Sequence, residues 1–202
     1  MADKQRKPGM NLPNKLTVLR IILVPVFMAF IYIDIIPLHF LWAAIIFAIA
    51  SLTDMLDGKI ARKRNLITTF GKFLDPLADK ILVIAALAVF VEIPEIQMSA
   101  VPLVIIITRE FMVSGMRLLA AEDGVVIAAG IWGKLKTAFT MAAIVVILLY
   151  LVIFCDLGLG SGIQEFVRTW VLDSLIWISA ALTVISGVVY MKNGWKFVAK
   201  TM

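Results

Sequence analysis

The sequence predicts an all-α, polytopic membrane protein in which six transmembrane helices form one bundle and both termini are cytoplasmic. Three observations lead to this prediction. Of the 202 residues, 62% are hydrophobic and the mean hydropathy is +1.01, whereas soluble domains are roughly 45–50% apolar. Six segments approach the length of about 20 mostly apolar residues that crosses a bilayer. The basic residues also gather on one side of these segments, which sets the orientation.

Short connections join the six segments, so we expect a single domain over residues 1–202, with residues 1–15 as a basic cytoplasmic extension. The predicted helices cover residues 16–33, 38–61, 69–91, 98–120, 133–154 and 170–191. The end of the second helix and the start of the third are polar, and the fourth contains Arg109, Glu110 and Arg117. Residues 156–169 are expected to form a polar outer loop.

The distribution of charge predicts which side of the membrane each connection faces. One side collects Lys4, Arg6, Lys7, Lys15, Arg62, Lys63, Arg64, Lys72, Arg117, Lys134, Lys136, Lys192, Lys196 and Lys200. The other side holds Asp34, Glu92, Glu95, Asp156 and Glu165, with Arg168 as its basic residue. Basic loops stay in the cytoplasm, so we expect both termini to be cytoplasmic. If the protein is bacterial, we expect it in the plasma membrane. Because topology explains these charges and no groove-reading motif is present, nucleic acid is not an expected partner.

Four aspartates lie at the predicted cytoplasmic ends of the second and third helices. Asp54 and Asp57 are spaced i, i+3, and Asp75 and Asp79 are spaced i, i+4, so each pair shares a helix face. One aspartate at the centre of a membrane helix costs about 2.5–3.5 kcal/mol, and divalent cations would relieve the repulsion among four. With one cysteine and one histidine in the chain, oxygen ligands favour Mg²⁺, Mn²⁺ or Ca²⁺. Two such ions suit the transfer of a phosphoryl or phosphodiester group.

Other interpretations of the aspartates remain open at this point. Asp75 precedes Pro76, so it could instead be the N-cap of a helix with proline at its first position. Asp54 and Asp57 could be hydrated residues at the membrane surface. A divalent-cation channel or transporter would also use acidic residues, but along a path across the membrane. Here the carboxylates gather at one end of two helices, which favours catalysis.

The spacing of these residues resembles the signature of a known family of membrane enzymes. Asp54-x2-Asp57-Gly58-x2-Ala61-Arg62-x8-Gly71-x3-Asp75-x3-Asp79 is similar at every fixed position to the signature of the CDP-alcohol phosphotransferases. Members of this family transfer a phosphatidyl or similar group from a CDP-linked donor to an alcohol and release CMP. The resemblance therefore implies an integral membrane enzyme, a homodimer, with its active site facing the cytoplasm.

The resemblance also implies a role for each matching position. Asp54, Asp57 and Asp75 would hold two divalent ions, Mg²⁺ or Mn²⁺, on the donor pyrophosphate. Asp79 would be the general base for the acceptor hydroxyl and would also contact a metal. The residues implied at the CDP site are Gly58, Ala61, Arg62 and Gly71.

Three further stretches narrow the acceptor. Residues 11–20, 108–121 and 133–137 resemble the branch of this family that makes phosphatidylglycerophosphate, with CDP-diacylglycerol as donor and glycerol 3-phosphate as acceptor. Asn14, Thr17 and Arg20 would then contact the donor, although they could also be ordinary cap and interface residues. Inositol phosphate, serine and phosphatidylglycerol are the alternative acceptors within the family.

An acceptor that bears a phosphate needs a cationic pocket, for which the candidates are Arg109, Arg117, Lys134 and Lys136. The alternative is that Arg117 and the two lysines anchor helix ends by snorkelling. Arg109 lies well inside an apolar segment, so its charge needs a partner. Neighbouring side chains on a helix do not share a face, so we expect that partner to be a carboxylate other than Glu110, or a bound anion.

Overall fold

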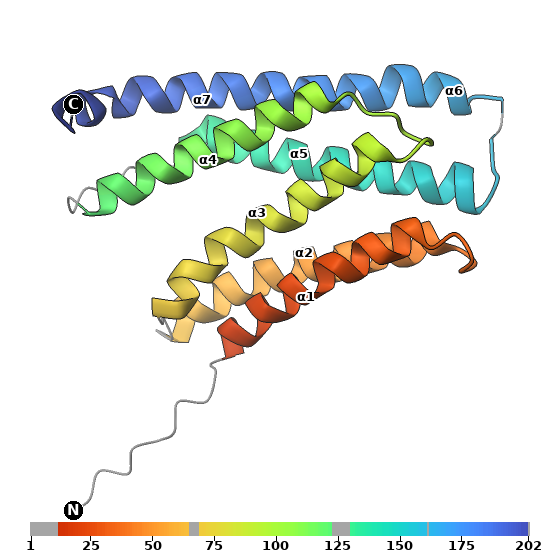
Figure 1. Ribbon diagram of the computed structural model, residues 1–202, viewed down its shortest axis with the longest axis horizontal. Coiled ribbons are helices and arrows are strands. Elements are labelled where there is room, and N and C mark those ends of the chain that lie inside the picture. Colours follow the sequence, from red (N-terminus) through yellow and green to blue (C-terminus); the bar gives the residue numbers. More distant parts are fainter. Residues whose placement is uncertain (1–11, 65–68, 123–129, 161, 202) are drawn as a thin grey trace, which may run out of the picture. The chain divides into compact units, whose positions relative to one another are not determined.

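The computed structural model describes residues 12–64, 69–122, 130–160 and 162–201, and every regular element among them is helical (Figure 1). The elements are α1 (Leu12–Tyr32), α2 (His39–Arg64), α3 (Thr69–Glu92), α4 (Ala100–Glu122), α5 (Ile131–Tyr150), α6 (Gln164–Phe166) and α7 (Asp173–Thr201), with π-helical turns η1 (Leu151–Asp156) and η2 (Val167–Leu172). The all-α prediction is confirmed for these residues. Each predicted helix corresponds to one long helix, but the last begins earlier and ends later than expected.

The connection before the last helix is shorter than the predicted outer loop. The π-helical turn η1 carries the fifth helix to Asp156, and α6 begins at Gln164 and continues through η2 into α7. Between them, Gly158 and Gly160 have φ angles of 62° and 73°. This is a left-handed backbone conformation that glycine adopts without steric cost. The expectation of a loop over residues 156–169 is therefore wrong for its second half.

The third helix decides between the two interpretations of Asp75. Helix α3 already begins at Thr69, so Asp75 and Pro76 lie inside a running helix. The hypothesis that Asp75 is an N-cap is wrong, because an N-cap lies just before the first helical residue.

Length and composition identify three spans in the part of the chain that the structure describes. Asn14–Tyr32, Ile131–Asp156 and Gln164–Gly194 have mean hydropathies of 1.9, 2.8 and 1.9, as expected of an integral membrane protein. Helices α2, α3 and α4 contain 26, 24 and 23 residues. At about 1.5 Å per residue they are long enough to cross a bilayer. Arg109, Glu110 and Arg117 interrupt the apolar sequence of α4, and α2 contains a shorter apolar segment, His39–Thr53.

The chain divides into two compact units, residues 1–85 and 86–202, with the boundary inside α3. In the first unit, α1 packs along α2 (Figure 1). Phe27 of α1 and Phe47 of α2 meet with their ring centroids 5.8 Å apart. Ala43 and Ala50 flank Phe47 on the buried face of α2 and are fully buried, so the two backbones can approach closely.

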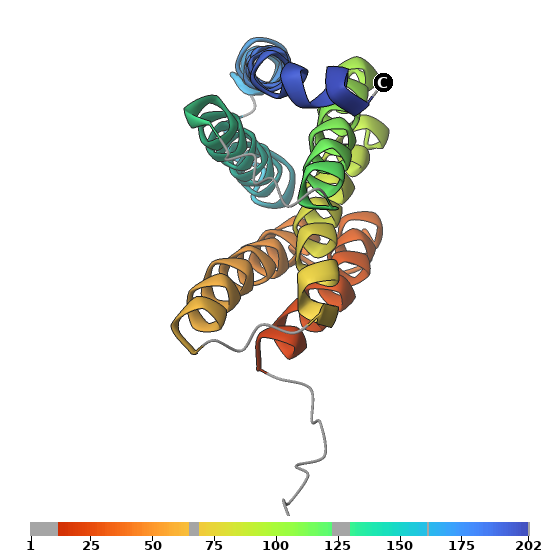
Figure 2. The ribbon, with the colours of Figure 1, turned by 90° about the vertical axis from the view of Figure 1, so that its left-hand side faces the viewer.

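In the second unit, α7 packs along both α4 and α5 (Figures 1 and 2). The contact between α5 and α7 has a polar half and an apolar half. The polar half contains the buried residues Lys136 and Thr140 of α5 and Ser179, Thr183 and Ser186 of α7; the apolar half contains Ala143, Ile144, Ile147, Leu172 and Ile176. Large apolar side chains such as Val146, Leu149 and Ile185 lie on the outside. Polar residues inside and apolar residues outside are what a lipid environment favours.

Replacing Phe27 with alanine should destabilise the first unit, because the phenyl ring that packs on Phe47 is lost and a cavity remains. We expect the midpoint of thermal unfolding in detergent to fall by several degrees. The matched control is Ile22→Ala on the same helix. Ile22 is 55% exposed, so its truncation should leave the midpoint nearly unchanged. Equal shifts for both variants would contradict the packing assigned to Phe27.

Candidate functional site

The first half of α1 buries a line of polar side chains. Asn14, Thr17 and Arg20 are 6%, 0% and 1% exposed, and each engages at least one partner. The line continues at steps of four and three residues through Val24 and Phe27, which are also buried, so it belongs to the face of α1 that packs on α2. These three residues are therefore not snorkelling or lipid-facing anchors. They are polar groups held inside the protein.

The four aspartates lie on two helices of the first unit, Asp54 and Asp57 on α2 and Asp75 and Asp79 on α3. Their helical backbone agrees with the prediction that each pair shares a face. Their side chains, like those of Arg62 and of the small residues Gly58, Ala61 and Gly71, lie outside what the structure describes. Among the residues it does describe, no group of three or more His, Cys, Asp or Glu could hold a metal. The metal, base and nucleotide roles of these eight residues remain predictions.

The second unit contains a buried ionic cluster formed by α4, α5 and α7. Arg109 Nη1 donates a hydrogen bond to Glu110 Oε1 at 2.9 Å, and Arg109 Nη2 donates to Ser186 Oγ at 2.7 Å. Lys136 Nζ donates to the same oxygen of Glu110. The side chains of Arg109, Glu110 and Lys136 are 11%, 18% and 6% exposed. One carboxylate thus ties together two cations from different helices.

The expectation that Glu110 would not pair with Arg109 is wrong. Adjacent residues on a helix do point their Cβ atoms in different directions. The arginine side chain, however, is long enough for its guanidinium to turn back toward the neighbouring carboxylate. In an apolar environment an unpaired charge costs more free energy than a bent side-chain conformation, so the pairing of Arg109 with Glu110 is favoured.

Arg109 and Lys136 share the carboxylate of Glu110. Arg109 Nε is buried and has no hydrogen-bond partner among the described residues. Gly187 leaves room for the arginine side chain, since a Cβ there would lie only 3.3 Å from Arg109 Cγ. A Cβ at Gly133 would meet Arg109 Nη2 at an ordinary contact distance of 3.6 Å. A buried cluster of two cations, with an N–H group that has no partner among the described residues, can bind an anion.

The other two predicted acceptor residues have different surroundings. Arg117 Nε donates to the hydroxyl of Tyr190 at 3.3 Å, and its Cζ lies 5.5 Å from the centre of the same ring, within the range of a cation–π interaction. Lys134 is exposed. The structure therefore brings Arg109 and Lys136 together, holds Arg117 against α7, and leaves Lys134 at the surface.

Sequence reasoning missed three residues of this region, namely Glu110 as a shared counter-ion and Ser186 and Tyr190 on α7. A signal was present for the last two. Ser179, Thr183, Ser186 and Tyr190 recur every three or four residues along an otherwise apolar segment. Such a polar stripe on a membrane helix faces other protein groups rather than lipid.

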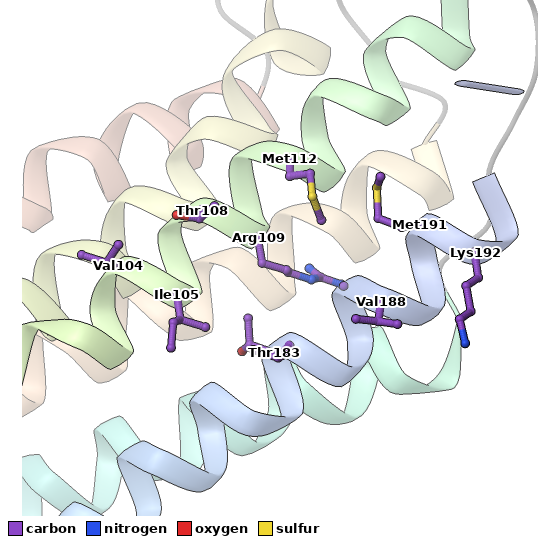
Figure 3. A pocket seen from close by; sticks show the side chains of 11 residues that line it. Val104, Ile105, Thr108, Arg109, Met112, Thr183, Val188, Met191 and Lys192 are labelled. Carbon is purple, nitrogen blue, oxygen red and sulfur yellow. The ribbon is translucent and has the colours of Figure 1, made fainter. Parts of the chain in front are cut away.

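A groove of about 670 Å³ lies between α4 and α7 (Figure 3). Its walls are mostly apolar and include Val104, Ile105 and Val188, and Arg109 reaches across it from α4 toward α7. Lys192 lies at one end. Apolar walls with cationic groups along them suit an amphipathic molecule better than a small polar one.

Comparison with known proteins gives one family and several full-length relatives. The profile of the family described as CDP-alcohol phosphatidyltransferase matches residues 10–191. A protein of Bacillus subtilis named CDP-diacylglycerol–glycerol-3-phosphate 3-phosphatidyltransferase is 41% identical over 197 residues, which cover 92% of this chain and 96% of the relative. A protein of Rickettsia bellii with the same name is 38% identical over 93% of this chain and 97% of its own length. A third, from Haemophilus influenzae, is 43% identical over 66% of this chain and 73% of the relative.

Glu110→Gln should strongly destabilise the second unit, because it leaves the buried cations Arg109 and Lys136 without their carboxylate. Breaking a buried ion pair in this way costs about 3–5 kcal/mol, which should appear as a lower midpoint of unfolding in detergent. Glu165→Gln is the matched control. Glu165 also pairs with an arginine, Arg168, but its side chain is 77% exposed, so we expect little change. A Glu110→Gln protein as stable as the control would contradict the role of shared counter-ion.

Proposed function

The chain belongs to the CDP-alcohol phosphatidyltransferase family, and we propose that it transfers the phosphatidyl group of CDP-diacylglycerol to glycerol 3-phosphate, giving phosphatidylglycerophosphate and CMP. The observation that carries this proposal is the similarity over more than nine tenths of the chain to relatives named for that reaction. The family match favours a transferase over a cation transporter.

The packing of α1 on α2 supports a donor site in the first unit. The connection between the two helices is short, so they run antiparallel, and Phe27 lies opposite Phe47. Seven residues before Phe27 is Arg20, and seven residues after Phe47 is Asp54; either step is about 10 Å along a helix. Arg20 and Asp54 therefore lie at the same height along the two antiparallel helices. By the same reasoning, Thr17 lies at the same height as Asp57.

The two aspartate pairs lie at similar distances from the ends of α2 and α3 that the short link joins. Only residues 65–68 separate the helices, so we infer that the end of α2 and the start of α3 lie on the same side of the membrane. Asp57 lies seven residues before the end of α2 at Arg64, and Asp75 lies six residues after the start of α3 at Thr69. Asp54 and Asp79 each lie ten residues from the same ends. The four carboxylates therefore lie about 10 and 15 Å from those helix ends.

Four carboxylates without competing thiol or imidazole ligands fit hard divalent ions, and we assign Asp54, Asp57, Asp75 and Asp79 to hold two ions of Mg²⁺ or Mn²⁺. When bound, such ions neutralise the donor pyrophosphate and stabilise the departing CMP. Asp79 takes the proton of the acceptor hydroxyl as that oxygen attacks the phosphorus that bears diacylglycerol. Arg62 contacts a donor phosphate.

Four small or polar residues complete the donor side of the proposal. Gly58, Ala61 and Gly71 leave room for the nucleotide, since none carries a side chain larger than a methyl group. Asn14, three residues before Thr17, continues the buried polar line of α1 toward the CDP head group.

The cationic cluster of the second unit supports an acceptor that bears a phosphate. Arg109 and Lys136 bring two cations to one place, where both contact the carboxylate of Glu110. We assign Arg109 and Arg117 to contact the phosphate of glycerol 3-phosphate directly. Lys136 contributes its charge from the ion pair with Glu110, and Lys134 contributes from the surface.

The orientation proposed for the enzyme follows from its charges and substrates. We propose six spans with both termini in the cytoplasm, an active site at the cytoplasmic surface, and a homodimer as in the family that the sequence resembles. The lipid tails of the donor would then stay in the bilayer while glycerol 3-phosphate enters from the aqueous side.

Purified protein should convert radiolabelled glycerol 3-phosphate into a lipid-soluble product when CDP-diacylglycerol and Mg²⁺ or Mn²⁺ are supplied. Excess chelator should abolish the product, and readdition of the metal should restore it. Labelled serine and inositol phosphate, tested in parallel, should give much less. A folded preparation that prefers one of these two acceptors would contradict the acceptor assignment.

Asp79→Asn should lower kcat by at least about 10²-fold, because the amide cannot accept the proton that a general base removes. Binding of CDP-diacylglycerol, measured directly, should be largely retained. Asp34→Asn is the control, since Asp34 lies in the exposed connection after α1 and should leave activity unchanged. A fully active Asp79→Asn enzyme would rule out Asp79 as the base.

A further inference from the structure

We propose that Ser186 and Tyr190 of α7 are positioning residues that hold Arg109 and Arg117 in place to bind the phosphate of the acceptor. This inference rests on the proposed function for the identity of the acceptor. It assigns a role to the last long helix, which carries none of the residues assigned above to the donor or acceptor site.

Ser186 fixes the direction of the Arg109 guanidinium. The hydroxyl of Ser186 accepts a hydrogen bond from Nη2 at 2.7 Å, while Nη1 donates to Glu110 at 2.9 Å. A guanidinium is planar, so two bonds to separate groups set both its position and the tilt of its plane. Ser186 is only 3% exposed, so water does not compete for its hydroxyl.

The residue after Ser186 also accommodates Arg109. A Cβ at Gly187 would lie 3.3 Å from Arg109 Cγ, closer than a comfortable contact. Helix α7 therefore offers a hydroxyl at one position and an open backbone surface at the next, where the arginine reaches it from α4 (Figure 3).

Tyr190 performs the same task for Arg117. Its hydroxyl accepts a hydrogen bond from Nε at 3.3 Å, and its ring lies beneath the guanidinium at 5.5 Å. The tyrosine is 6% exposed and packs against Val113 and Met116 of α4, so the ring itself has little freedom to move.

The spacing along the two helices draws the two arginines together. Arg109 and Arg117 are eight residues apart on α4, which corresponds to about 12 Å along the helix. Their partners Ser186 and Tyr190 are four residues apart on α7, which corresponds to about 6 Å. The guanidinium groups thus converge toward one stretch of α7, which suits two cations that share one phosphate.

Ser186→Ala should raise the KM for glycerol 3-phosphate about five- to tenfold, because a buried hydrogen bond to a charged group is lost. The kcat and the KM for CDP-diacylglycerol should change less than twofold. Ser186→Thr, which keeps the hydroxyl, should restore most of the acceptor affinity. Tyr190→Phe should show the same selective effect at about threefold, since the ring contact remains.

Ser179→Ala is the matched control. Ser179 is also buried on α7, and its hydroxyl meets Thr140 at 2.6 Å, but no arginine is involved. It should lower the unfolding midpoint about as much as Ser186→Ala while leaving the acceptor KM unchanged. If the acceptor KM is normal in Ser186→Ala and Tyr190→Phe, or rises equally in Ser179→Ala, the proposal is wrong.

Direct binding separates this inference from the proposed function. Equilibrium binding of radiolabelled glycerol 3-phosphate to the intact protein should be clear for the wild type and weaker for Ser186→Ala and Tyr190→Phe. Wild-type binding without any lipid product would refute the reaction while supporting the positioning roles. A wild type that does not bind glycerol 3-phosphate, or variants that bind it as well as the wild type, would overturn the inference.

Discussion

The ionic contact of Glu110 with Arg109 and Lys136 is the constraint around which the second unit is arranged. Each cation comes from a different helix, and both donate to the same carboxylate oxygen. In an apolar bundle a charge that finds no partner costs several kcal/mol, so α4 and α5 must keep these groups in register. Gly133 of α5 lies beside the guanidinium of Arg109. Packing and charge are therefore decided at one place.

Helix α7 connects this ionic contact to the rest of the unit. Its buried hydroxyl groups bond to α5 through Thr140 and to α4 through Arg109, and Tyr190 holds a second arginine. Hydrogen bonds between membrane helices hold them in register where apolar packing alone discriminates poorly against lipid. The polar half of the α5–α7 contact coincides with the ionic cluster, while the other half is apolar. One end of the unit is thus suited to polar ligands and the other to the membrane.

Much of the fold could be predicted from the sequence, because apolar segments of membrane length must be helical to satisfy their backbone hydrogen bonds. The errors have physical causes. Two glycines confined the outer turn to fewer residues than polarity suggested, and the helix resumed at Gln164. Asp75-Pro76 looked like a helix start, but a proline in an early turn does not reveal that the helix began at Thr69. The pairing of Arg109 with Glu110 depended on a long side chain turning back on itself.

By itself, the sequence determined the helical class and the family, and it predicts the chemistry of the four aspartates, since spacing along a helix and the choice of oxygen ligands are local properties. Only the tertiary structure decided which groups share a charge and which hydroxyls hold the arginines. Contacts such as Arg109–Ser186 join residues 77 positions apart. No local pattern encodes such a contact, because it exists only once α4, α5 and α7 have packed and excluded both water and lipid.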